Sequence, residues 1–244
     1  MENYKLRESL MKSFLSVVIL LLIFLSSAIA QTTDEILAKH FKLIGQEKLL
    51  TYGRYVTKGK IYQGGMEIPF VSYHKKPDKF KSVAAIRGNK FTRAFDGEKG
   101  WFSTSKDKPK VLPLEQTKGL EIQADYEGIF YNYKMKGNTV KYLGREKVNN
   151  INSFVLQLTE PNGDVVTAYL EPEGYKIIKT KFKTTVQGTN REFETDLSNY
   201  KVVDGIIDPF DIKTKLEGKV ITHIVIDSID YNRAVPDSIF YMPK

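Results

Sequence analysis

Between Tyr175 and Tyr200, charged residues alternate with apolar residues or threonine, with lysines first and acidic residues later. A period of two over this length is typical of a β-hairpin whose faces have different surroundings. With the turn centred on Gly188 and Thr189, hairpin geometry predicts these pairs on a solvated face: Lys183 with Glu194, Lys181 with Asp196 and Thr185 with Glu192. The other face carries Thr184–Phe193, Phe182–Thr195 and Thr180–Leu197, completed by Ile178 and Val186. That apolar face has to be covered by something else.

The same period of two recurs along most of the chain. Gly, Pro or Asn signals bound further segments at 54–63, 68–74, 80–87, 90–95, 139–143, 154–158, 165–170, 210–216 and 220–226. Gly64-Gly65, Asn162-Gly163 and Glu217-Gly218 predict turns between neighbouring strands. We expect about ten or eleven antiparallel strands, and a sheet of this width curls because it cannot stay flat and open.

Two stretches break this period and predict helices. Thr32 or Thr33, followed by Asp34 and Glu35, has the spacing of a capping box. An apolar stripe follows and Gly45 ends it, with a short second turn expected at 46–50; the stripe is Ile36, Leu37, Phe41 and Ile44.

The second stretch is the block 113–136, which predicts a central helical insertion. Its apolar residues fit helical turns better than alternation: Leu114, Leu120, Ile122, Tyr126, Ile129, Phe130 and Tyr133. The predicted fold is therefore mainly β (α+β), with one curved antiparallel sheet of about eleven strands whose concave side is covered by the N-terminal helix and this insertion.

Residues 1–30 are typical of a secretory signal peptide. Lys5, Arg7 and Lys12 precede the apolar run 14–25, and 28–30 (Ala-Ile-Ala) is a small-residue cleavage site. We expect cleavage after Ala30 and an exported, periplasmic protein, in which 31–244 is a single domain. The alternatives are a start at Met11 and an uncleaved membrane anchor, for which the apolar run is short.

Composition limits the partners. Removing residues 1–30 takes three from the 37 basic residues and two from the 29 acidic ones, which leaves 34 and 27. A modest excess of lysine indicates a solvated surface, with attraction to anionic lipid headgroups as the alternative. The chain has no Cys, and hence neither disulfides nor a thiolate metal site. No RNA-binding signature is present, so nucleic acid is not an expected partner.

Two motifs carry a family resemblance. Residues 75–80 read Lys-Lys-Pro-Asp-Lys-Phe, and residues 95–102 read Phe-Asp-Gly-Glu-Lys-Gly-Trp-Phe. With the leading signal and the order of helix, strands, insertion and strands, they resemble the periplasmic outer-membrane lipoprotein carriers, the LolA/LolB-like proteins. The end of the chain, 240–243, resembles the late strand of that family.

The resemblance implies an incomplete antiparallel barrel whose mouth is closed by helices, with an apolar cavity for the acyl chains of a lipoprotein or lipid. Residues expected to line it are Ile36, Phe41, Phe80, Phe91, Phe95, Trp101, Phe130, Phe182 and Phe193. In the carriers, an Arg before the Pro latches the helical lid to the sheet. Here that position is Lys76, which lacks the planar fork of donors. Arg93 is the second latch candidate.

Several of these residues have a simpler interpretation. Trp101, the only Trp, is expected to be a core aromatic, with a ligand contact as the alternative. On the strand 90–95 we expect Thr92 and Ala94 to face inward and Arg93 to be solvated; the opposite orientation would bury Arg93 with Phe91 and Phe95. Phe130, Tyr131 and Tyr133 are expected to pack in the core or the lid.

Catalytic signals are weak. His40, His74 and His223 are far apart in sequence, and His223, which alternates with Ile221 and Val225, is expected to be a satisfied core residue rather than a metal ligand. Asp204, Asp208 and Asp211 are explained by turn chemistry, although Asp208 and Asp211 would be the pair for a glycoside hydrolase. The chain contains no G-x-S-x-G, H-E-x-x-H or phosphate-binding glycine loop.

We therefore expect a carrier of acyl chains that is not an enzyme and needs no metal or other cofactor. Other partners left open are the envelope membrane surface and transport complexes. The alternative function is a structural or sensory envelope module that binds a partner protein with the same sheet.

Overall fold

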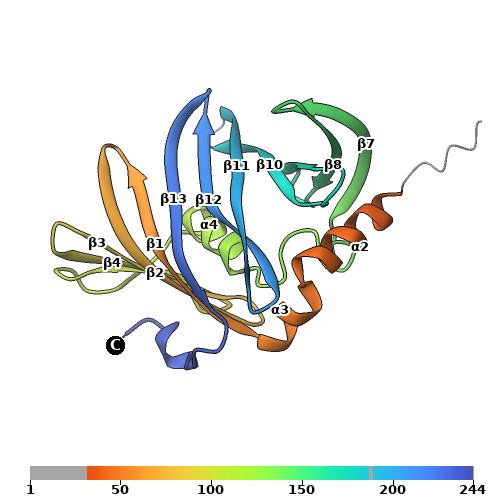
Figure 1. Ribbon diagram of the computed structural model, residues 1–244. Coiled ribbons are helices and arrows are strands. Elements are labelled where there is room, and N and C mark those ends of the chain that lie inside the picture. Colours follow the sequence, from red (N-terminus) through yellow and green to blue (C-terminus); the bar gives the residue numbers. More distant parts are fainter. Residues whose placement is uncertain (1–31, 187–188, 244) are drawn as a thin grey trace, which may run out of the picture.

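The computed structural model describes residues 32–186 and 189–243; the predicted signal peptide lies outside them. The strands form one antiparallel, curved and unclosed sheet of thirteen strands in the order β6-β5-β4-β3-β2-β1-β13-β12-β11-β10-β9-β8-β7 (Figure 1). The predicted fold class is confirmed. The count exceeds eleven mainly because the short strands β5 and β6 extend one edge of the sheet.

The helices are α2 (Thr33–Ile44), α3 (Gln46–Tyr52), α4 (Leu114–Ala124) and the 3-10 turn η1 (Asp237–Ile239). The strands of the first half are β1 (Arg54–Gln63), β2 (Met66–Lys75), β3 (Lys79–Ile86), β4 (Asn89–Phe95), β5 (Gly100–Thr104) and β6 (Lys110–Val111). Those of the second half are β7 (Thr139–Val148), β8 (Ile151–Thr159), β9 (Val165–Leu170), β10 (Ile177–Val186), β11 (Thr189–Val203), β12 (Ile206–Leu216) and β13 (Lys219–Asp230).

The register of the β10–β11 hairpin differs from the predicted one by two residues. Val186 pairs with Thr189, so that Phe182 lies opposite Phe193 and Lys181 opposite Glu194. The observed register still places lysines opposite acidic residues, and it adds an aromatic pair where we expected Phe182 opposite Thr195, which stabilises the hairpin better. Because the shift is an even number of residues, the side chains from Thr180 to Thr185 keep their predicted faces. Ile178 does not, because a bulge between Ile177 and Lys179 turns it toward Val155 and Tyr169 on the other face.

The predicted N-terminal helix is confirmed, including its ends. Thr32 accepts a hydrogen bond from the amide of Glu35, the Glu35 side chain accepts one from the amide of Thr32, and Gly45 ends α2 at φ 76°. The central helix is shorter than predicted, because 125–137 forms turns instead. Gly128, Asn132 and Gly137 all have positive φ there, which breaks the helical path.

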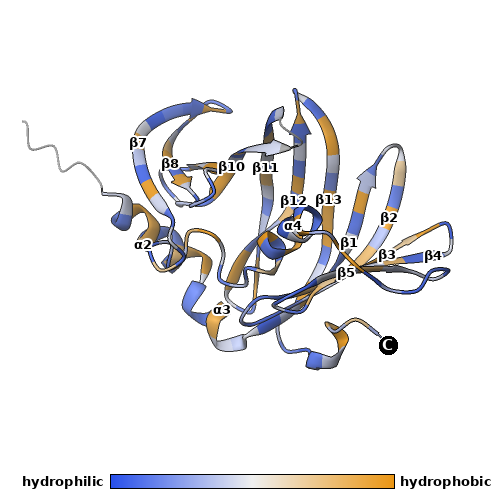
Figure 2. Cartoon of the chain, turned by 180° about the vertical axis from the view of Figure 1, so that it is seen from behind, coloured by the Kyte–Doolittle hydropathy of each residue, from blue (hydrophilic) through white to orange (hydrophobic). Residues whose placement is uncertain are grey.

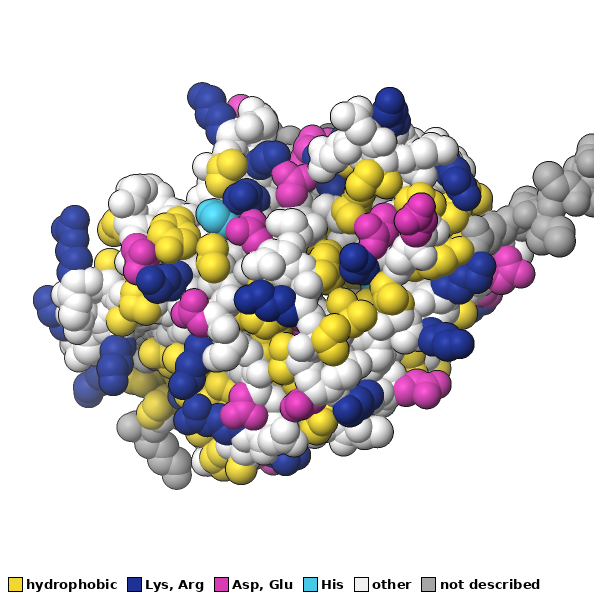
Figure 3. Space-filling model, viewed as in Figure 1, with side chains coloured by type: hydrophobic (Ala, Val, Ile, Leu, Met, Phe, Trp, Pro, Cys, Tyr) yellow, Lys and Arg dark blue, Asp and Glu magenta, His cyan; other side chains and the backbone are white. Residues whose placement is uncertain are grey.

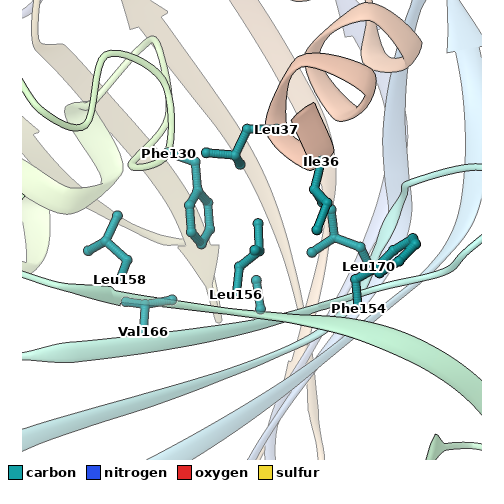
Figure 4. Packing of buried hydrophobic residues seen from close by; sticks show 9 residues of the cluster. Ile36, Leu37, Phe130, Phe154, Leu156, Leu158, Val166 and Leu170 are labelled. Carbon is teal, nitrogen blue, oxygen red and sulfur yellow. The ribbon is translucent and has the colours of Figure 1, made fainter. Parts of the chain in front are cut away.

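The concave face carries two buried clusters, one toward each edge of the sheet. The larger joins Ile36 and Leu37 of α2 and Phe130 to the apolar residues of β8 and β9, which face them in Figure 4: Phe154, Leu156, Leu158, Val166, Ala168 and Leu170. In the smaller, Leu120 and Ala124 of α4 pack on Phe80 and Phe95.

The C-terminal segment crosses the opposite, convex face of β1–β5 and is not the late strand that we predicted at 240–243. Val235 and Phe240 pack on Val56 there. Lys75 Nζ donates to the carbonyl of Val235 (2.9 Å) and Lys81 Nζ to that of Ile239 (3.0 Å). These bonds to carbonyl oxygens leave the segment no free edge to pair as a strand.

Gly45 is the point where the helices meet the sheet, and replacing it by alanine should be costly. A Cβ there would lie 2.6 Å from the carbonyl oxygen of Gly205, at a φ that alanine rarely adopts. We expect Gly45→Ala to lower the free energy of unfolding by about 3 kcal/mol in urea titrations. The matched control is Gly218→Ala, which has φ 75° but meets no atom of the described chain within 4 Å. It should cost only about 1 kcal/mol; equal losses would contradict the role of the contact with Gly205.

Candidate functional site

A row of apolar side chains crosses the concave face from strand to strand. Leu197 of β11 lies opposite Ile212, Ile212 opposite Ile224, Ile224 opposite Ile61, and Ile61 opposite Ile68 of β2. We call these five residues the apolar row. Phe193 of β11 and His74 of β2 lie beside Phe182 and Phe80, which pack on the concave face. Leu197 and Ile68 are an even number of residues from Phe193 and His74, so both ends of the row lie on that face.

The helices do not bury this row fully. The main contacts of α4 are with β3, β4 and β5, whereas those of α2 are with β7 and β12, and those of α3 are with β12. Ile68 is buried, but the other four side chains of the row are only half-buried. The concave face therefore carries apolar surface beyond what its own helices exclude from water. Figure 2, which views the protein from behind, shows α4 in front of the strands.

A groove of about 870 Å³ lies at the end of the sheet where β10 and β11 meet. Phe182 and Phe193 line it from the sheet and Ile122 from α4. Ile122 is 52% exposed although it is a large apolar residue of a helix that rests on the sheet. Polar side chains surround this apolar part, among them Lys118, Lys183 and Glu192. The volume is that of a small-molecule binding site, and the lining suits an amphipathic ligand.

The central insertion is held to the N-terminal helices by specific bonds. Gln46 Nε2 donates to the carbonyl of Glu127 (2.9 Å), and the Tyr126 hydroxyl donates to the carbonyl of Leu49 (3.0 Å). Tyr133 and Lys134 both donate to Asp34 of α2 (3.0 Å each). The insertion and the N-terminal helices therefore form one connected cover.

Beneath this cover lies a cluster of polar side chains, of which Tyr126 and Tyr231 are buried and Tyr55, His74 and Asp208 are half-buried. The Tyr55 and His74 rings stack with their centroids 4.3 Å apart, and the Tyr231 hydroxyl donates to Asp208. Burial lowers the pKa of His74 to about 3, although a backbone hydrogen bond at Gln123 favours the charged ring. Burial also raises the pKa of Asp208, which the bond from Tyr231 offsets in part. These groups anchor the cover on the sheet.

The convex face of β10–β13 is a ladder of ion pairs, as its alternation predicted. Lys179 Nζ contacts Glu194 (2.9 Å), Lys183 contacts Glu192 (3.0 Å) and Lys215 contacts Asp196 (2.6 Å). Basic and acidic side chains are interspersed across the face shown in Figure 3. Such pairs contribute little each, but they keep this face solvated.

The structure separates the nine predicted cavity residues. Phe182 and Phe193 line the groove. Four others, Ile36, Phe80, Phe95 and Phe130, are buried in the two clusters, and Phe41 packs against the larger one. Phe91 is half-buried on the concave face, with its ring 6.4 Å from that of Phe102.

Trp101 does not fit the prediction of a cavity residue, and its interpretation as a core aromatic describes it better. It is 2% exposed, and its Nε1 donates to the carbonyl of Phe240 (2.6 Å) in the C-terminal segment on the convex face. Its strand partner Ala94 faces the same way and is fully buried. Phe95 consequently faces α4, the orientation that we did not favour, yet Arg93 on that face is exposed as expected.

The two latch candidates occupy different environments. Lys76 Nζ lies 5.9 Å from the centre of the Tyr126 ring, so it contacts the insertion through a cation–π interaction. Arg93 forms no ion pair within the described chain. The direct hydrogen bonds between the insertion and the N-terminal helices come instead from Gln46 and Tyr126, which sequence reasoning did not single out for this role. The available sequence signal for these two residues was that polar side chains lie within or near the predicted helical segments.

Neither catalytic alternative finds a matching arrangement. Asp208 points to the polar cluster beneath the cover, whereas Asp211, three residues along the same strand, pairs with His223 (2.9 Å) on the convex side, so the two carboxylates do not face each other. His223 is thus half-exposed in an ion pair, and the prediction of a core histidine was wrong. Across 32–186 and 189–243, no His, Asp and Glu side chains form a group of three that could hold a metal ion.

Solved structures share this architecture. A DUF1329 family protein from Desulfovibrio piger superimposes with a TM-score of 0.60 at 12% identity, over 84% of this chain and 97% of its own. A LolA superfamily protein from Nitrosomonas europaea gives a TM-score of 0.57 at 13% identity, over 80% and 97%. A domain described as that of an outer membrane lipoprotein-sorting protein from Vibrio parahaemolyticus gives 0.56 at 15% identity, over 81% and 94%.

The chain therefore has the LolA-like fold that its motifs suggested, an unclosed antiparallel sheet that curves around helices. At these identities the likeness concerns the fold. No protein-family model and no curated protein matches the sequence. None of the described helices is long and apolar enough to cross a bilayer.

Asp208 should make the free energy of unfolding fall as the pH rises above the ordinary pKa of an aspartate. Because its pKa is raised on folding, the folded state holds the proton more tightly, and stability is lost as the pH rises through the unfolded and then the folded pKa. Asp208→Asn keeps an acceptor for Tyr231 and cannot ionise. We expect its free energy of unfolding, relative to the wild type, to rise as the pH increases above about 4, the unfolded pKa of an aspartate, in urea titrations.

Asp211→Asn is the matched control, with the opposite sign. Burial raises the pKa of Asp211, but the hydrogen bond from His223 and the nearby Lys213 outweigh it, so that the pKa lies below its ordinary value. Asp211 therefore stabilises the fold above the unfolded pKa of about 4, so Asp211→Asn should be less stable than the wild type there, and the difference should shrink as the pH falls below that value. Parallel curves for the two variants would contradict the assigned environments.

Proposed function

We propose that the protein carries the acyl chains of a lipid or lipoprotein on the concave face of its sheet, under the cover formed by α2, α3 and residues 113–137. The observation that carries this proposal is the apolar row, which stays half-exposed although it lies in the centre of the concave face. The LolA-like fold supports it, and one of the similar structures is described as a lipoprotein-sorting domain.

The energetics suit reversible carriage. Burying about fourteen methylenes at about 0.8 kcal/mol each gives a gross gain of about 11 kcal/mol. Ordering and association costs of about 4 kcal/mol, the low end of their range, leave about 7 kcal/mol, which corresponds to micromolar binding. No bond has to be made or broken, so the cover has only to move aside for cargo to enter and leave.

The site and the N-terminal sequence lead to one proposed setting. We infer that 1–30 exports the protein, that 31–244 is the carrier domain, and that it works in the periplasm of the cell envelope, as the LolA-like resemblance implies. Lys76, which contacts Tyr126, is the proposed remnant of the family latch. The charge ladder keeps the opposite face in water while the concave face holds cargo.

A charge placed in the groove tests the proposal. Ile122→Arg puts a guanidinium beside Phe182 and Phe193, where an acyl chain would have to displace its hydration. We expect it to weaken binding of a fluorescent long-chain fatty acid to the delipidated protein at least about ten-fold, because desolvating the charge beside an acyl chain costs more than 1.4 kcal/mol. Titration followed by fluorescence measures this.

Val202→Arg is the control for that variant. Val202 is 68% exposed on β11 near its turn to β12, so the same substitution changes charge and hydrophobicity away from the groove. Fatty acid affinity should stay within about two-fold of the wild type. Wild-type protein that binds no fatty acid would refute the carrier, and lipid-independent capture of an envelope protein would then support the binding-module alternative.

A further inference from the structure

The hairpin tips of the first half of the sheet and of β12–β13 lie at one end of the molecule. The closing pairs are Gln63–Met66, Ile86–Asn89 and Leu216–Lys219. The loop after β5 joins them, since the amide of Ser105 donates to the carbonyl of Lys90 and the amide of Lys90 donates to Ser105 Oγ (3.0 Å each). We call the segments 62–67, 86–90, 104–110 and 216–221 the tip rim. The pair Val186–Thr189 closes the β10–β11 hairpin at the same end, so the groove opens there too.

The tip rim carries an excess of free positive charge. Six exposed cations form no ion pair within the described residues: Arg87, Lys90, Lys106, Lys108, Lys110 and Lys219. In Figure 3, Lys and Arg side chains gather at the left-hand extremity, where β3 and β4 end in Figure 1.

The acidic residues of the rim, by contrast, already have partners. Glu67 pairs with Lys60 (2.7 Å), Glu217 pairs with Arg191 (3.8 Å), and Asp107 accepts a hydrogen bond from Thr104 (2.7 Å). Six cations thus face only one carboxylate without an ion pair, that of Asp107, so the unpaired charge is mainly positive, and it is spread over separate hairpins rather than held in one pocket.

Exposed apolar side chains accompany these cations. Met66 and Tyr62 are each 38% exposed on the β1–β2 tip, and Val220 and Ile221 are 53% and 37% exposed on the β12–β13 tip. The two tips are neighbours, because Tyr62 pairs with His223 across β1 and β13. Charge and apolar surface thus share one end of the molecule.

We propose that the tip rim docks on an anionic lipid bilayer, which directs the open end of the groove toward the membrane. The role of this docking in delivering cargo rests on the proposed function, whereas the charge and exposure of the rim do not depend on it. Scattered lysines attract a surface of many headgroups, and short apolar side chains on hairpin tips can enter the headgroup region. An acidic protein would need a defined set of partners for these cations, and the wide spacing of the rim residues over four segments favours a fluid surface.

Co-sedimentation with vesicles of phosphatidylcholine mixed with phosphatidylglycerol, and of phosphatidylcholine alone, tests this. We expect the wild type to bind the anionic vesicles and to dissociate as salt is raised. The variant Lys106→Gln, Lys108→Gln, Lys110→Gln should bind on the order of 100-fold more weakly, since each lysine at such a surface contributes roughly five-fold.

The control variant is Lys42→Gln, Lys99→Gln, Lys147→Gln, which removes the same charge from exposed lysines outside the tip rim and should bind within about three-fold of the wild type. Met66→Ser with Val220→Ser should weaken binding on the order of ten-fold, with an unchanged salt dependence.

Fatty acid binding without vesicles separates the two proposals. Rim variants that no longer bind vesicles but still bind fatty acid support membrane docking. Wild-type protein that binds vesicles but no fatty acid would refute only the proposed carrier function. Wild-type protein that prefers no vesicle type, or a rim triple that binds like its control, overturns membrane docking; retention of an acidic protein in that case would assign the rim to a protein partner.

Discussion

The central constraint on this protein is that a thirteen-stranded sheet has to hide the apolar side chains of its concave face without closing on itself. Helices hide the two ends: α2 with Phe130 covers β8 and β9, and α4 covers β3–β5. Between them the apolar row stays half-exposed. Apolar surface that is left in contact with water can be stabilised by a ligand, which connects the packing of this fold to its proposed function.

The two faces divide the remaining tasks. The convex face is solvated by the ion-pair ladder on β10–β13 and covered by the C-terminal segment over β1–β5, where Trp101 and Phe240 are buried. The two parts of the cover on the concave face are joined to each other by a few polar bonds, and the cluster around Asp208 lies beneath them. The cover packs tightly at the two ends of the sheet, so the middle of the concave face is the region that the proposed cargo would complete.

Alternation and turn signals were sufficient for the fold class and for every strand except β5 and β6, because most strands show a solvated and an apolar face and Thr32 and Gly45 mark both ends of α2. They could not fix which residues line the groove. Phe80, Phe95 and Phe193 look alike in sequence, and only the path of α4 buries the first two and leaves the third at the groove. Trp101 and Phe240 meet across a sequence separation of 139 residues, which no local pattern contains. The turn signal likewise misplaced the β10–β11 register by two residues, because it does not say which cross-strand pairs are most stable.

The most direct measurement is the accessibility of the apolar row with and without lipid. The chain contains no Cys, so Ile224→Cys introduces a single reporter thiol in the middle of the row. The delipidated protein should react with a water-soluble maleimide, and a saturating long-chain fatty acid should block that reaction, while Leu156→Cys in the fully buried cluster stays unreactive in both states. A thiol at position 224 that is protected without lipid, or one that reacts equally with and without it, would contradict a concave face that is completed by an acyl chain.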